Sequence, residues 1–227
     1  FCGVLRYFNN SFLKNTDQLV TIVQPNIKQK NKWILKNREK HLNILIELSN
    51  KNRDSLNNKN RIIIWPETSF EGSIPREKKL LSNVGEKILK NKNTTLILGL
   101  LRTDENKVFN SLVFLNSRGD IIHNYDKIKL VPFGEYLPFR KYLEALTDLS
   151  ASKDFTSGKL KFNPSIYGFE NIITLICYEI LFTNEIVRRL SKNTNLLINI
   201  TNDAWFGKTI GPYQHLALAK IKAVEFG

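Results

Sequence analysis

Three residues with reactive side chains lie at or just past the ends of apolar runs in this sequence. Glu67 follows the apolar residues of "IIIWPET", Lys127 follows "IIHNYD", and Cys177 ends "NIITLIC". Folds that alternate strands with helices place their chemistry outside the carboxyl ends of the strands. A carboxylate, an ammonium and a thiol therefore form the candidate catalytic set.

These three groups are sufficient for acyl transfer. A thiol attacks a carbonyl only as the thiolate, so Cys177 needs a nearby base or cation. A carboxylate in an apolar pocket has a raised pKa and can accept the thiol proton, which is the role open to Glu67. The ammonium of Lys127 can stabilise the oxyanion of a tetrahedral intermediate, helped by the backbone N–H that follows the cysteine.

Each residue also has a simpler interpretation. Cys177 could be a small core residue, Glu67 could cap a turn, and Lys127 could be one of many surface lysines. His123 and His215 are alternative bases for the thiol, but neither lies in a cysteine-protease signature, and we interpret both as structural or supporting, with His215 nearer the site. No His, Cys, Asp and Glu residues have metal-site spacing along the chain, so we predict no metal site.

The composition favours one globular α/β domain with a basic surface. The chain has 227 residues, 42% of them hydrophobic, and a net charge of +13. The lysines are scattered among asparagines without interleaved aromatics or a nucleic-acid motif, so we predict no nucleic-acid partner. Contact with anionic lipid headgroups remains open.

The sequence contains no apolar run of the length that crosses a membrane, about 18 residues or more. Its opening "FCGVLRYF" is nevertheless typical of the last turns of a span. We therefore expect residues 1–17 to be the end of a membrane span and a linker, and residues 18–227 to be a catalytic domain. Cysteines at positions 2 and 177 alone form no disulfide framework.

Short apolar runs alternate with longer helical patterns, which predicts a sheet covered by helices. The "SRGD" turn joins two adjacent runs and makes the predicted sheet mixed rather than purely parallel. The predicted strands are 18–24, 61–67, 94–101, 108–116, 120–127, 171–177 and 195–201, and the predicted helices are 33–56, 76–90, 179–190 and a last one from about 212.

The order "WPET", "YDKIKLVPFGEYLPF", "ICYEI" and "NDAWFGKTIGPYQH" resembles the nitrilase, or carbon-nitrogen hydrolase, superfamily and, within it, the apolipoprotein N-acyltransferase family of bacteria. The superfamily implies a four-layer α/β/β/α sandwich, here truncated at its C-terminal end, and a Glu-Lys-Cys triad. Matched motif by motif, Glu67 takes the place of the general base, Lys127 that of the oxyanion-stabilising cation, and Cys177 that of the nucleophile.

The same resemblance implies supporting and substrate-binding residues. Glu135, already an unusual carboxylate between Gly134 and Tyr136, would support the triad, while Tyr178 and Glu179 would shape the thioester pocket. Trp33 matches a position expected to meet lipid, and Trp205 lies near the rim of the active site by the same analogy. Both tryptophans could equally be packing residues.

We therefore expect an acyltransferase that works through a thioester on Cys177, without a cofactor. The resemblance implies a phospholipid acyl donor, a diacylglyceryl apolipoprotein acceptor, and a place at the bacterial inner membrane with the catalytic domain on its periplasmic face. One alternative is a soluble carbon-nitrogen hydrolase, in which water resolves the acyl-enzyme formed by the same triad. Another is an inactive, basic domain that binds membrane surfaces.

Overall fold

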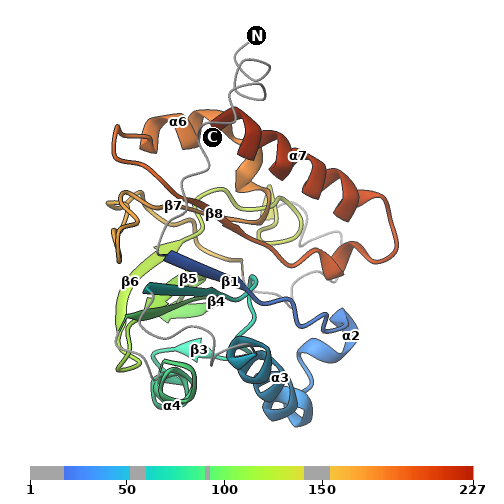
Figure 1. Cartoon of the computed structure of the whole chain (residues 1–227). Coiled ribbons are helices and arrows are strands. Elements are labelled where there is room, and N and C mark those ends of the chain that lie inside the picture. Colours follow the sequence, from blue (N-terminus) through green and yellow to red (C-terminus); the bar gives the residue numbers. More distant parts are fainter. Residues whose placement is uncertain (1–17, 52–59, 90–92, 141–153, 227) are drawn as a thin grey trace.

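The computed structural model describes residues 18–51, 60–89, 93–140 and 154–226. These residues form four layers in the order helices, sheet, sheet, helices (Figure 1). The predicted α/β/β/α sandwich is thus confirmed. Among the same residues no helix has the length and apolarity needed to cross a bilayer. The predicted span end and linker at 1–17, with Cys2, lie outside the described ranges.

The larger sheet is mixed, as the turn between its last strands predicted. Its strand order is β1 (Gln18–Ile22), β2 (Asn60–Ile64), β4 (Thr94–Asp104), β5 (Lys107–Leu115) and β6 (Ile121–Asp126), with β3 (Ser73–Ile74) also beside β4. β1, β2 and β4 run parallel, whereas β4, β5 and β6 form an antiparallel meander. Both faces of this sheet are covered, which explains why its strands read as continuous apolar runs.

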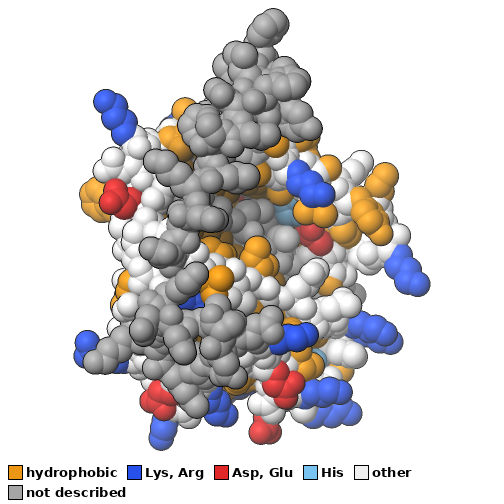
Figure 2. All heavy atoms as spheres, viewed as in Figure 1, with side chains coloured by type: hydrophobic (Ala, Val, Ile, Leu, Met, Phe, Trp, Pro, Cys, Tyr) orange, Lys and Arg blue, Asp and Glu red, His pale blue; other side chains and the backbone are white. Residues whose placement is uncertain are grey.

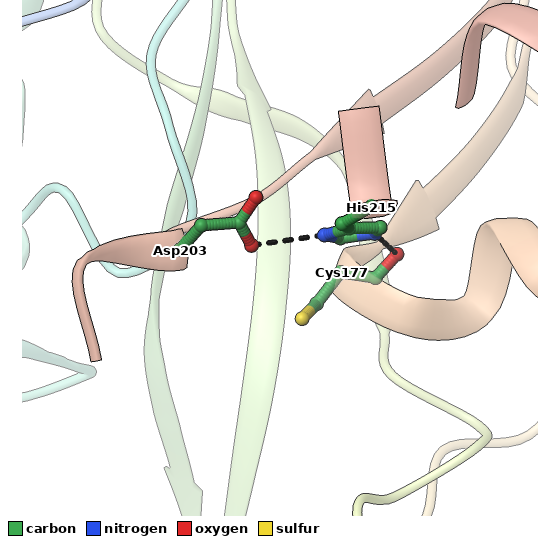
Figure 3. A group of neighbouring side chains, drawn as sticks. All are labelled: Cys177, Asp203 and His215. Carbon is green, nitrogen blue, oxygen red and sulfur yellow. Dashed lines mark hydrogen bonds and ion pairs between the residues drawn. The ribbon is translucent and has the colours of Figure 1, made fainter. Parts of the chain in front are cut away.

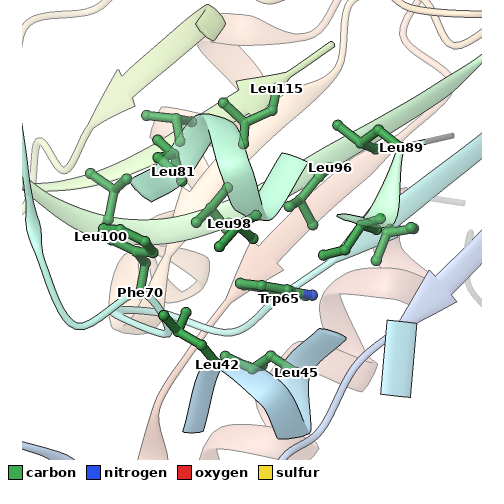
Figure 4. Close-up of a cluster of buried hydrophobic side chains, with 14 of the residues drawn as sticks. Leu42, Leu45, Trp65, Phe70, Leu81, Leu89, Leu96, Leu98, Leu100 and Leu115 are labelled. Atoms are coloured by element: carbon green, nitrogen blue, oxygen red, sulfur yellow. The ribbon is translucent and has the colours of Figure 1, made fainter. Parts of the chain in front are cut away.

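The outer face of the larger sheet is covered by α3 (Arg38–Asn50) and α4 (Lys78–Ile88). Leucines from both helices and from β4 surround Trp65 in the core between helices and sheet (Figure 4). The helix predicted from Trp33 begins instead at Arg38. Residues before it form the short α2 (Gln29–Lys32) and a 3-10 turn, η2 (Leu35–Asn37), because Leu35 is 82% exposed and gives no buried helical stripe there.

The smaller sheet consists of two parallel strands, β7 (Ile173–Ile176) and β8 (Leu197–Ile200). α6 (Thr183–Arg189) and α7 (Gly211–Phe226) cover its outer face (Figure 1). Its inner face packs on the larger sheet through one apolar cluster, formed by Ile62, Ile97, Leu112, Phe114, Tyr125, Phe169, Ile172, Ile176, Cys177, Ile198 and Ile200. The core between the two sheets therefore ends at the candidate nucleophile.

The predicted helix 179–190 is two separate helical pieces. The 3-10 helix η5 (Cys177–Leu181) comes first. Phe182, with φ −89° and ψ 79°, is not helical and separates η5 from α6. The tighter turn lets the Glu179 side chain reach back to the backbone N–H of Ile176 at 2.8 Å. Another 3-10 turn, η6 (Asp203–Phe206), follows β8.

On the face shown in Figure 2, the basic side chains are dispersed rather than gathered in one continuous patch. Lys and Arg side chains are distributed around the edge of the face in Figure 2, with acidic side chains among them. Hydrophobic side chains gather over α7 and the turn before it, where exposed residues include Trp205, Ile210, Tyr213 and Ile221.

A glycine in β4 allows the chain after β2 to lie directly on the sheet. A Cβ placed on Gly99 would be 2.5 Å from the backbone nitrogen of Thr68 and 2.6 Å from the Cα of Glu67. Gly99 also receives a 3.2 Å hydrogen bond from the backbone N–H of Phe70 to its carbonyl. Glu67 therefore sits where it does only because position 99 has no side chain.

We expect Gly99→Ala to lower the free energy of unfolding by about 1–3 kcal/mol, because the added methyl group must displace backbone rather than a flexible side chain. Gly134→Ala is the matched control, since its Cβ would meet Val131 Cγ1 at an ordinary 3.4 Å. Chemical denaturation of both variants measures the difference. Equal stability of the two variants would contradict the close approach.

Candidate active site

The structure brings Glu67, Lys127 and Cys177 together from two sheets. Glu67 follows β2 and Lys127 follows β6 in the larger sheet, whereas Cys177 follows β7 in the smaller one. All three are buried, with 7%, 1% and 4% of their surfaces exposed. The backbone of Cys177 has φ +56°, in the left-handed region that residues with a Cβ rarely adopt. Such strain is common at functional sites and turns this side chain away from the strand direction.

Hydrogen bonds hold the Glu67 carboxylate at both oxygens. Oε1 accepts from Asn110 Nδ2 at 2.7 Å, and Oε2 accepts from the backbone N–H of Asn202 at 3.0 Å. Its own backbone carbonyl accepts a 3.3 Å hydrogen bond from Lys32 Nζ. The carboxylate is thus fixed by contacts from both sheets.

The ammonium of Lys127 lies between two carboxylates. Its Nζ is 2.8 Å from Glu135 Oε2 and 3.7 Å from Glu67 Oε1. Glu135 is held in turn by the backbone N–H of Val131, at 2.8 Å, and by Asn110 Nδ2, also at 2.8 Å. The amide of Asn110 therefore bridges both carboxylates, and Glu135, which the resemblance implied would support the triad, lies beside Lys127.

Burial and the neighbouring charges set the pKa values of the three groups. Burial raises the pKa of Glu67, against the opposing effect of the Lys127 ammonium. Burial lowers the pKa of Lys127, but the carboxylates of Glu67 and Glu135 outweigh it, and the net shift is upward. Burial, with the nearby Glu67 charge, raises the pKa of Cys177 to about 12. The resting site therefore contains a neutral thiol, a firmly charged ammonium and a carboxylate suited to taking up a proton.

Glu179 joins the nucleophile turn to the loop that carries Lys127. Its Oε1 accepts from the backbone N–H groups of Ile128, at 2.8 Å, and Lys129, at 2.9 Å, while Oε2 accepts from Ile176. Tyr125 OH donates to both oxygens at 3.0 Å. Burial raises the pKa of this carboxyl, and the backbone donors oppose that shift. Glu179 thus fixes the position of backbone on both sides of the site.

Tyr178 contacts the same loop from the next position. Its hydroxyl donates to the carbonyl of Leu130 at 2.5 Å, and its ring lies 5.5 Å from Lys127 Nζ. Its backbone N–H forms a hydrogen bond with the Cys177 sulfur that lowers the pKa of the thiol, against the larger effect of burial. A donor at this point can also face an oxyanion.

His215 of α7 lies beside Cys177, near the candidate site as we expected, but it contacts backbone rather than the thiol. Its Nε2 is 3.2 Å from the carbonyl oxygen of Cys177, and its Nδ1 is 2.9 Å from Asp203 Oδ1 (Figure 3). The hydrogen bond with Asp203 raises the pKa of His215. His123 lies on β6 and packs edge-on against Phe114 at 5.3 Å between ring centroids.

A cleft of about 370 Å³ reaches Glu67 from the side of α2. Lys32 and Asp203 line it, and burial lowers the pKa of Lys32 to about 8. Trp33 and Trp205 are each about half exposed, and Trp205 stacks on Phe206 at 4.0 Å between ring centroids. Neither tryptophan is buried as a core residue would be.

The sequence did not lead us to predict several residues of the site. Asn110 lies within an apolar strand, "VFNSLVF", where a polar residue that needs a partner was the available signal. Asn202 and Asp203 follow β8 as Glu67 and Lys127 follow their strands. Lys32 gave no signal, because it is one lysine among several in its segment.

Comparisons with known proteins show the family and the fold of this chain. The sequence profile described as carbon-nitrogen hydrolase matches residues 19–227. The apolipoprotein N-acyltransferase of Brucella suis is 32% identical over 94% of this chain and 41% of its own length, and that of Rhizobium etli is 35% identical over 92% and 40%. The chain thus spans about two fifths of these relatives. The carbon-nitrogen hydrolase of Helicobacter pylori has the same fold, with a TM-score of 0.58, 18% identity and coverage of 90% of this chain and 68% of that one.

The raised pKa of Cys177 predicts how its reaction with iodoacetamide depends on pH. Only the thiolate reacts, so the rate should rise about tenfold for each pH unit from about pH 7 to about pH 10, with no plateau. An ordinary thiol, with a pKa of about 8.5, levels off within that range. Mass spectrometry of a Cys2→Ser variant follows this one site. A plateau near pH 8.5 would contradict the neutral resting thiol.

Proposed function

The chain belongs to the carbon-nitrogen hydrolase family, and we propose that it is the catalytic domain of an apolipoprotein N-acyltransferase. It would move a fatty acyl chain from a phospholipid to the N-terminal amine of an S-diacylglyceryl cysteine. The observation that carries the proposal is the buried group of Glu67, Lys127 and Cys177, held by Glu135. The names of the curated relatives support the choice of this branch.

In the first half-reaction the Cys177 sulfur attacks the ester carbonyl carbon of the phospholipid while Glu67 accepts the thiol proton. The C–S bond forms and the carbonyl oxygen becomes an oxyanion, which Lys127 Nζ and the backbone N–H of Tyr178 stabilise. The intermediate then expels the lysophospholipid alkoxide, which takes the proton from Glu67. A thioester on Cys177 remains.

In the second half-reaction the lipoprotein amine attacks the thioester carbonyl carbon. Glu67 accepts a proton from the amine, the C–N bond forms, and the C–S bond breaks. The departing sulfur recovers the proton from Glu67, which regenerates the neutral thiol. Burial has the largest influence on the Glu67 carboxyl and raises its pKa. The raised pKa suits this carboxyl to accepting and returning a proton in each half-reaction.

The remaining residues are proposed to support these steps. Glu135 keeps Lys127 charged and oriented by its 2.8 Å contact. Tyr178 and Glu179 shape the thioester pocket through their contacts with the loop after Lys127. The exposed rings of Trp33 and Trp205 are available to acyl chains at a membrane surface. The inner membrane, with this domain on its periplasmic face, is the proposed location.

Cys177→Ser should abolish the covalent acyl-enzyme, and Glu67→Gln should slow its formation by at least about 10²-fold, the lower range for a general base. Single-turnover assays on the full-length protein in detergent micelles, with radiolabelled phospholipid, measure thioester formation. Acceptor lipopeptide should then release N-acylated product rather than free fatty acid. Wild-type acylation by Cys177→Ser would overturn the mechanism, and release of fatty acid alone would favour a hydrolase.

Lys127→Met should leave phospholipid binding near normal and slow acylation by roughly 10²- to 10³-fold, the scale for losing one oxyanion donor. Lys129→Met is the matched control. The Lys129 side chain is 40% exposed and its ion pair is a 3.3 Å contact with Glu185, outside the triad. Thermal melts check folding, because Lys127→Met leaves two carboxylates without their cation. Equal losses of rate in both variants, or a loss explained by weaker lipid binding, would contradict the assignment.

A further inference from the structure

Three potential metal ligands converge beside the nucleophile. A ligand atom from each of Cys177, Asp203 and His215 lies within 4.8 Å of the other two, and the side chains face a shared space (Figure 3). They come from the start of η5, from η6 and from α7. The prediction that no metal site exists relied on spacing along the chain, and that spacing does not reveal this cluster.

The orientation of the His215 ring is that of a metal ligand. Its Nε2 can donate to the carbonyl oxygen of Cys177, at 3.2 Å, which directs Nδ1 toward the Asp203 carboxylate at 2.9 Å. Histidines that bind metals commonly donate their other ring N–H to a backbone carbonyl in this way. Both neighbours of the ring are oxygen acceptors, so a cation beside Nδ1 can take the place of the proton there.

We propose that a borderline-soft divalent cation such as Zn²⁺ binds to Cys177 Sγ, an Asp203 oxygen and His215 Nδ1. Binding of this cation would inhibit the enzyme, because it occupies the Cys177 sulfur. Thiolate, imidazole and carboxylate together are a donor set that favours Zn²⁺ over Mg²⁺ or Ca²⁺. Binding forms the S–Zn, N–Zn and O–Zn bonds in place of bonds to water of the hydrated ion, and the protons of the thiol and of Nδ1 pass to the buffer. The inhibitory consequence rests on the proposed role of Cys177, whereas the binding does not.

The geometry needs only small adjustments to accept the ion. Tetrahedral Zn²⁺, with bonds of about 2.0–2.3 Å, sets its ligand atoms roughly 3.3–3.7 Å apart. The Nδ1 to Oδ1 distance of 2.9 Å must widen slightly, and rotation of the Cys177 side chain can bring the sulfur closer. Thr201 Oγ1 donates to Asp203 Oδ1 at 2.9 Å and orients the carboxylate.

The surroundings offer a path and a compatible charge. Thr201 and Asp203 line the 370 Å³ cleft, so an ion can reach the cluster from solvent at Asp203, whereas Cys177 and His215 are buried behind it. The charge of Lys127, which acts on the Cys177 thiol, already lies between the carboxylates of Glu67 and Glu135. Its repulsion of a divalent ion is therefore largely offset.

Cobalt titration tests the site without measuring activity. Co²⁺ added anaerobically to the full-length protein should give a sulfur-to-cobalt charge-transfer band that Zn²⁺ abolishes. Cys177→Ser should lose the band, which separates this thiol from Cys2. Asp203→Asn and His215→Gln should each weaken Co²⁺ binding by about 10- to 100-fold or more. A loss of this size is typical even when only the hydrogen-bond partner of a metal ligand is changed. His41→Gln is the matched control, because His41 is a buried histidine that pairs with Glu71 instead.

A second measurement uses the wild-type protein, so it does not depend on whether a variant folds. Zn²⁺ should protect wild-type Cys177 from iodoacetamide, and EDTA should restore the reaction. Absence of the cobalt band, its persistence in Cys177→Ser, or affinities unchanged in both ligand variants would overturn the site. Binding of Zn²⁺ with undiminished thioester formation would overturn only the inhibition. Failure of the metal to bind would leave the proposed acyltransferase function intact, because thioester formation is measured separately and can be run with EDTA present.

Discussion

The burial of one ammonium group controls the arrangement of this site. Lys127 is 1% exposed, and a buried cation without partners would destabilise the fold by several kcal/mol. Glu67 and Glu135 supply the partners, and Asn110 donates to both so that two carboxylates can lie close together. The loops after β2 and β6 are consequently held to β5. Their positions follow from the need to neutralise this charge.

The position of Cys177 depends on a second set of contacts, made to backbone rather than to side-chain charges. Cys177 adopts a left-handed conformation that its own Cβ disfavours. Glu179 holds the preceding Ile176 N–H, and His215 faces the Cys177 carbonyl oxygen. Contacts on both sides of the residue therefore maintain a conformation that the isolated turn would not keep.

Local pattern predicted a sheet covered by helices and the three reactive residues at the ends of strands, whereas the four-layer arrangement was implied by the resemblance to the superfamily. Apolar runs mark buried strands, and Glu67, Lys127 and Cys177 follow such runs directly. Contacts between segments far apart in the sequence produce no such local pattern and were not predicted. The start of α3 depends on how the preceding segment packs. The closeness of Asp203 to Cys177 depends on how η6 and α7 pack against the smaller sheet, whereas the motif before His215 had already indicated that this histidine lies near the site.

The division of the site between two sheets has a consequence for how the protein could be taken apart. Residues up to 140 carry Glu67 and Lys127, and residues from 154 onward carry Cys177 and Asn202. Hydrogen bonds from the second part reach the first at Glu67, Ile128 and Lys129. Two separately produced halves would each lack a complete reaction centre. Recovered chemistry on mixing would then report that the halves had associated in their native register.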